Sequence, residues 1–149
     1  MDLPSAIPSL LPLAIEWAQA TAAEAAESGI PLNDDGARLA RRVGVRFPER
    51  IRVAVVDALP LPPDAALRQA ALDHGLLGPS SAGLTLGHTV FVRRGVESRR
   101  LLSHEFRHVF QYEEAGSIAA FLPRYLGQIA EYGYDNAPLE VDARDHEVE

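Results

Sequence analysis

The amino-acid sequence predicts an α+β fold in which a small β-sheet packs against several helices. Two observations support this prediction: helical patterns occupy both ends of the chain, and two segments rich in β-branched residues, 51–56 and 83–92, lie between them. With 149 residues, of which 47% are hydrophobic, the chain can bury a core. We therefore expect a single domain over residues 1–149.

The first part of the chain, residues 1–80, is expected to contain three helices and one strand. Side chains between Leu10 and Thr21 recur at helical spacing, and Gly29 ends this helix. Alternating β-branched residues favour a strand over residues 51–56. The remaining two helices are expected over residues 33–44 and 64–75.

The second part of the chain is expected to contain one strand and three helices. Every second side chain from Leu84 to Val92 falls on one face, which predicts a strand that pairs with the first one. Helices are expected over residues 98–114 and 117–132, with Pro123 starting or kinking the second half of the latter. A last short helix begins near Asn136 and tolerates Pro138 in its first turn.

Composition excludes several classes of function. The net charge of −7 argues against nonspecific binding to nucleic acid or to anionic membranes. All 14 basic residues are arginine, so lysine-dependent chemistries are excluded, and the absence of cysteine excludes thiol nucleophiles and thiolate ligands. The apolar N-terminus has no positive charge before Arg38 and contains three prolines, unlike a signal peptide or a membrane span. A cytoplasmic location is the default expectation.

The segment LLSHEFRHVFQYE, residues 101–113, contains the candidate site. His104 and His108 are four residues apart, so on a helix both imidazoles can reach one metal ion. Glu105 is too close in sequence to be a comfortable third ligand but is placed beside a metal-bound water, whose proton it could take. The HExxH pattern therefore predicts two zinc ligands and a general base. The alternative is a buried helix whose two histidines are satisfied by hydrogen bonds alone.

A catalytic zinc site needs a third protein ligand. The extended pattern with a third histidine soon after HExxH is absent, so a carboxylate from another helix is expected. We favour Glu140, because Ala143 lies one turn later and a small residue there lets two helices approach closely. Asp142 and Glu131 remain alternatives, and an acidic residue in the first turn of a helix is also favoured by the helix dipole without any metal.

Residues 83–144 resemble a known type of bacterial metallopeptidase. The resemblance lies in GLTLGHTVFV, LLSHEFRHVFQYE, GSIAAFLPRYL and YGYDNAPLEVDAR. The part up to Gln111 is similar to the core domain of extracellular contractile injection systems, which is described as a metallopeptidase. The distal part resembles gluzincins, including relatives of the CaaX prenyl proteases, although Arg144 stands where those relatives usually have aspartate.

The resemblance implies a minimal zincin fold for residues 83–144, with zinc held by His104, His108 and Glu140 and with Glu105 as the base. It also implies that the strand from Leu84 to Val92 is a sheet edge that binds an extended peptide. Residues 1–80 take no part in the resemblance, and their role is not predicted.

Further site candidates follow from position in the sequence. His88 shares a strand face with apolar residues, and it and the adjacent Thr89 are candidates for substrate contact. A tyrosine can stabilise an oxyanion, and Tyr134 is favoured over Tyr132 and Tyr112. For each of these residues, an ordinary packing or hydrogen-bonding role is the alternative.

Two helical neighbours of the histidines are assigned to the surface. Arg107 and Gln111 are expected on the wetter flank of their helix. Neither residue is therefore predicted to belong to the site.

The function expected from these patterns is zinc-dependent hydrolysis of a peptide or protein substrate. Two alternatives remain: a non-catalytic scaffold stabilised by a metal ion, and an interaction domain without metal. These alternatives differ in whether metal is bound and whether Glu105 supports turnover.

Overall fold

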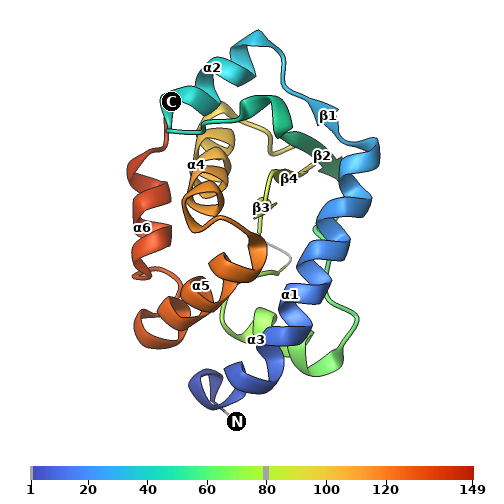
Figure 1. The fold of residues 1–149 in the computed structure, drawn as a ribbon, viewed down its shortest axis with the longest axis vertical. Coiled ribbons are helices and arrows are strands. Elements are labelled where there is room, and N and C mark those ends of the chain that lie inside the picture. Colours follow the sequence, from blue (N-terminus) through green and yellow to red (C-terminus); the bar gives the residue numbers. More distant parts are fainter. Residues whose placement is uncertain (1, 79–80) are drawn as a thin grey trace.

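The computed structural model describes residues 2–78 and 81–149 and has the predicted α+β architecture. Helices surround a four-stranded mixed sheet, with α4 between the sheet and α6, and α1 on the other side of the sheet (Figure 1). The helices are α1 (Leu3–Ser28), α2 (Asp34–Arg42), α3 (Ala65–Asp73), α4 (Arg99–Ala115), α5 (Ile118–Tyr132) and α6 (Pro138–Asp145), with a short 3-10 helix η1 (Pro48–Arg50). The strands are β1 (Ile30–Pro31), β2 (Arg52–Val56), β3 (Gly83–Leu86) and β4 (Thr89–Arg93).

Helix α1 begins well before the predicted start at Leu10. Asp2 caps it by accepting a hydrogen bond from the Ser5 amide, and Pro4 occupies the first turn, where its missing N–H costs nothing. Pro8 and Pro12 follow at intervals of four, so each removes only the bond to the carbonyl of the preceding proline. All three prolines are exposed, which lets water satisfy those carbonyls and keeps the helix intact.

The sheet has the order β1-β2-β4-β3, so β3 forms one of its edges. Strands β2 and β4 are parallel, as the crossover through α3 allows, whereas β3 and β4 are antiparallel. The prediction of one strand over residues 83–92 was wrong, because the segment folds back on itself. The two-residue turn begins with Gly87, whose φ of +67° suits the first position of such a turn.

The two faces of β4 bury different parts of the molecule. Val90 and Val92 pack with Phe106 of α4 and with apolar residues of α2. Phe91, between them, points to the other face and packs with α1 and α5. The alternation of a strand thus places α4 against one face of the sheet and α1 against the other.

The boundaries of α4, α5 and α6 follow from local capping residues, glycine and proline. Ser98 caps α4 by accepting from the Leu101 amide, and Gly116 ends it with a φ of +99°, close to the predicted range of 98–114. Ser117 caps α5 in the same way, and Pro138 lies in the first turn of α6 as predicted.

The hydropathy of the described helices gives no membrane-spanning segment. None of the helices in residues 2–78 and 81–149 combines the length and the apolar character needed to cross a bilayer.

Candidate metal centre

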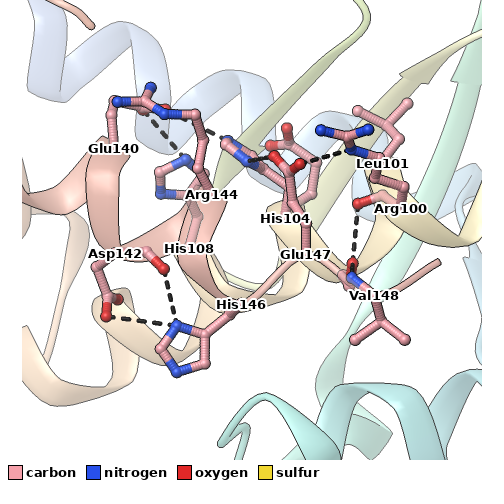
Figure 2. A network of polar contacts seen from close by, with 12 residues as sticks. Arg100, Leu101, His104, His108, Glu140, Asp142, Arg144, His146, Glu147 and Val148 are labelled. Atoms are coloured by element: carbon pink, nitrogen blue, oxygen red, sulfur yellow. Dashed lines mark hydrogen bonds and ion pairs between the residues drawn. The ribbon is translucent and has the colours of Figure 1, made fainter. Parts of the chain in front are cut away.

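Three side chains from α4 and α6 converge on one point. His104 and His108 lie one turn apart on the same face of α4, with ring centroids 4.9 Å apart. Glu140 projects from the first turn of α6 towards both rings (Figure 2). One nitrogen of each histidine and one oxygen of Glu140 lie within 4.8 Å of one another, and this group could hold a metal ion.

The spacing of these atoms suits a tetrahedral ion. His104 Nε2 lies 3.3 Å from Glu140 Oε1, and His108 Nε2 lies 3.1 Å from Glu140 Oε2. Ligands bonded to zinc at about 2.0–2.1 Å in a tetrahedron are about 3.3–3.4 Å apart. Each histidine nitrogen therefore lies at nearly this separation from one carboxylate oxygen of Glu140, and one ligand atom from each of the three residues lies within 4.8 Å of the others.

Gln111 sets the orientation of His108. Its amide nitrogen donates to the Leu139 carbonyl and to Asp142 Oδ2, both at 2.9 Å, which turns its oxygen Oε1 towards His108. His108 Nδ1 lies 2.8 Å from that oxygen and must carry the proton to donate to it. In the neutral ring, the lone pair is then on Nε2, which faces Glu140.

Glu147 plays the same part for His104. The segment after α6 lies along α4, where the Val148 amide donates to Ser103 Oγ (Figure 2). This places Glu147 Oε2 2.8 Å from His104 Nδ1, while Arg100 donates to Oε1 at 2.7 Å. A carboxylate behind a histidine fixes its tautomer and raises its basicity as a ligand. The lone pair of neutral His104 is therefore also on Nε2.

Two nitrogen lone pairs and a carboxylate thus face one another in a buried space. Tyr125 donates to Glu140 Oε2 at 2.7 Å, but among the described residues Oε1 has no hydrogen-bond partner. Glu140 is only 2% exposed, so water does not satisfy it freely. Such a cluster of acceptors is stable only with a cation among them, either protons on the imidazoles or a metal ion. The donor set fits zinc.

The pKa values of the metal-free cluster show how strongly it attracts positive charge. Burial opposes ionisation of His108, but the hydrogen bond and negative charge of Glu140, with the charge of Glu105, raise its pKa to about 9. Burial likewise opposes the charge of Glu140, but contacts with His104, His108 and Tyr125 hold its pKa well below the usual range. The pKa of His104 is also raised, because contact with Glu140 and the charge of Glu105 outweigh its burial.

Glu105 lies beside the cluster without belonging to it. The Thr85 hydroxyl of β3 donates to Oε1 at 2.8 Å and fixes the carboxylate. Gly83 lies against it so closely that a Cβ atom at this position would be 3.0 Å from Oε2. The edge strand therefore both orients Glu105 and, through a residue without a side chain, leaves room for it.

The carboxylates left open by the sequence lie in different places. Asp142 is two residues from Glu140 and points to another side of α6, where it accepts from Arg107 Nε at 2.8 Å. Glu131 is exposed on α5. Of these three carboxylates, Glu140 is the one that lies between the two histidines.

The three candidate tyrosines lie in different surroundings. Tyr134 lines both cavities beside the cluster, and burial with the charges of Glu140 and Glu105 raises its pKa, so its hydroxyl is protonated at neutral pH. Tyr132 is 48% exposed at the end of α5. Tyr112 is buried and donates to the Thr85 carbonyl at 3.1 Å. Tyr125, which donates to Glu140, was missed because it is further in sequence from the predicted ligands His108 and Glu140 than the three tyrosines that were considered.

The structure does not bring the two expected substrate contacts to the cluster. His88 lies in the hairpin turn instead of on a strand face, and its Nε2 is 2.8 Å from Glu113 Oε2. Thr89 is buried and donates to the Ala22 carbonyl of α1 at 3.1 Å. Neither residue lines a cavity beside the cluster.

The prediction that Gln111 lies on a wetter flank was also wrong, since it is 5% exposed and contacts His108. Its position three residues after His108 is the signal that could have identified it. Glu147 has no such signal, because its contact with His104 depends on how the last residues cross α4.

Two cavities meet at the site. One, of about 130 Å³, is largely apolar and extends beneath α1, with His108 and Glu140 in its wall. The other, of about 520 Å³, is more polar and includes His104 and Glu147. Leu76, Gly83, Glu105 and Tyr134 line both cavities.

Comparisons with protein families, curated proteins and solved structures find no match for this chain. The resemblance of residues 83–144 to metallopeptidases remains a prediction.

Proposed function

We propose that the protein is a zinc-dependent hydrolase that cleaves peptide bonds. The observation that carries the proposal is the convergence of His104, His108 and Glu140 beside Glu105. A structural zinc site closes with four protein ligands, whereas a catalytic one has three and an open position. Among the described residues the group has three members, which supports the catalytic assignment.

His104, His108 and Glu140 would hold the ion. When bound, zinc would polarise the substrate carbonyl and make an adjacent water more acidic. Glu105 is fixed by Thr85 and lines both cavities, which supports a role as the base that would take a proton from the attacking water. It would then return this proton to the leaving nitrogen as the carbon–nitrogen bond breaks. Tyr134 lines both cavities, and its protonated hydroxyl, which contacts Glu140 in the metal-free protein, would donate to the developing oxyanion when substrate is bound.

An extended substrate would add to β3 at Gly83, because at Thr85 the edge is buried beneath Tyr112 of α4. The Thr85 carbonyl accepts from Tyr112 and so points away from β4. Backbone groups alternate between the two sides of a strand, so those of Gly83 also point to the free edge. A peptide that added to β3 at Gly83 would lie near Glu105, because the carboxylate of Glu105 packs against Gly83.

The test compares three proteins purified without a histidine tag. Elemental analysis should find about one zinc per chain in the wild type and in Glu105→Gln, and markedly less in His104→Ala. Hydrolysis of a peptide library should be lost in both variants, because a base is removed in one and a ligand in the other. Equal hydrolysis by the wild type and Glu105→Gln would contradict the proposed mechanism. Bound zinc that stabilises the fold without any hydrolysis would instead favour a non-catalytic metal site.

A further inference from the structure

The cavity beneath α1 has a wall that no part of the proposed chemistry uses. Leu3, Ile7, Leu10, Ala14 and Ala18 line it at intervals of three or four residues, so one stripe of α1 faces the cavity. Apart from Glu105, His108 and Glu140, its described lining carries no charge. This wall comes from residues 1–80, the part of the chain without a predicted role.

The cavity is continuous with the candidate centre. Glu105 and Tyr134 line it together with the polar cavity, and His108 and Glu140 form its inner end. A substrate group bound in this cavity would therefore be separated by only a few covalent bonds from the peptide bond held at the cluster. Binding sites are typically apolar with a few polar groups that orient the ligand, and this cavity has that composition.

We infer that the substrate carries a compact apolar group beside the bond that is cleaved, and that this group occupies the cavity beneath α1. The inference rests on the proposed hydrolase function and names its substrate class: peptides with a phenylalanine-like or leucine-like side chain at that position.

Volume decides the size of the group. An apolar protein cavity of about 150 Å³ takes up one benzene molecule. At about 130 Å³, this cavity matches a single ring or branched side chain and is too small for a long acyl chain.

The charges that line the cavity determine which kind of side chain it accepts. An acidic side chain would lie near Glu105 and Glu140, and no described lining residue could neutralise it other than His108. A basic side chain would enter a wall built from aliphatic and aromatic groups. The cavity therefore selects against both charged types.

The first arm of the test needs neither metal nor turnover. Benzene is titrated into the metal-free protein of residues 1–149, and its binding is followed by amide chemical shifts. Binding is expected in the wild type and to be lost in Ala14→Leu, which fills the cavity. Ala20→Leu makes the same change on the exposed face of α1 and should bind benzene like the wild type. Absence of binding in the wild type, or equal binding in Ala14→Leu, would overturn the inference.

The second arm uses zinc-loaded protein and peptides that differ at one position. The kcat/KM for phenylalanine or leucine should exceed that for aspartate or serine by about tenfold or more. Ala14→Leu should reduce this preference, whereas Leu10→Ala, which enlarges the cavity, should shift it towards a naphthyl side chain. Hydrolysis of all peptides at equal rates would overturn the inference and leave the hydrolase proposal standing. Benzene binding without hydrolysis of any peptide would instead contradict the hydrolase proposal, and the substrate assignment with it.

Discussion

The two parts of the chain contribute differently to the same site. Residues 83–149 provide His104, His108, Glu140 and Glu105, together with the side chains that orient them. Residues 2–78 provide the apolar cover, since α1 and α3 form much of the cavity wall. The candidate metal ligands are thus concentrated in one part of the sequence, while much of the cavity wall beside them comes from the other. Substitutions in the two parts should consequently affect different observables.

The largest expected effect is the dependence of zinc stabilisation on Glu140. A ligand that binds only the folded state at a thousand times its Kd stabilises it by about 4 kcal/mol. The wild type should gain about this much when zinc is added to the metal-free protein, and Glu140→Gln should lose most of the gain. Glu24→Gln, the same change on the exposed face of α1, should keep it. Denaturant unfolding with and without zinc measures all three, and an equal gain in Glu140→Gln would contradict the proposed ligand.

The next effect concerns pH. The folded-state pKa of His108 is raised from 6.5 to about 9, so its stabilising contribution is complete below about pH 6.5 and is lost as the pH rises to about 9. The pKa of Glu140 is lowered, so its contribution is present above about pH 4.5 and is lost as the pH falls. Metal-free protein should therefore be most stable between about pH 4.5 and 6.5, and lose about 3 kcal/mol at most from His108 above that range.

Zinc should reverse this slope, because its ligands must be deprotonated to bind it and its stabilisation grows with pH. Thermal unfolding from pH 5 to 9, with chelator and with zinc, measures both slopes. His108→Asn should flatten them, whereas His74→Asn, in the cover-forming part of the chain, should not. Parallel slopes with and without zinc would contradict a metal site built on His108.

A smaller effect is expected from Gln111. Loss of a side chain that orients a metal ligand typically lowers metal affinity by about 10–100-fold. Gln111→Met keeps the volume of the buried side chain but removes its contacts with His108, Leu139 and Asp142. Gln19→Met, on the exposed face of α1, is the matched control and should bind zinc like the wild type. Calorimetric titration with zinc distinguishes the two, and unchanged affinity in Gln111→Met would show that His108 needs no such support.

The smallest effect separates stability from catalysis within the C-terminal part. Gly127 is exposed in α5, and a Cβ atom there would meet nothing within 4 Å, so Gly127→Ala should stabilise the protein by about 0.8–1.0 kcal/mol through helix propensity. Gly83→Ala should press on Glu105 and lower kcat with little change in zinc content. Unfolding and peptide hydrolysis are measured for both variants. A loss of zinc in Gly83→Ala would mean that the edge strand shapes the metal centre itself.

Much of the fold was predictable because its signals are local. Caps at Ser98 and Ser117 and the period of α4 depend on neighbours in sequence, and these helices lie close to their predicted ranges. The hairpin at Gly87 was missed because alternation continues across a two-residue turn, which keeps the period of two while reversing the chain. The start of α1 was missed because three prolines at intervals of four cost less in an exposed helix than their number indicates.

The sequence by itself determined that His104 and His108 share a face, because four residues make about one helical turn. It favoured Glu140 but left Asp142 as an alternative, since either could face α4 until the rotation of α6 was known. Packing made that choice by pairing Asp142 with Arg107 and burying Glu140 against the histidines. Only the tertiary structure could place Gln111, Glu147 and the apolar wall of α1 around the cluster, because those contacts join residues whose positions depend on the whole fold.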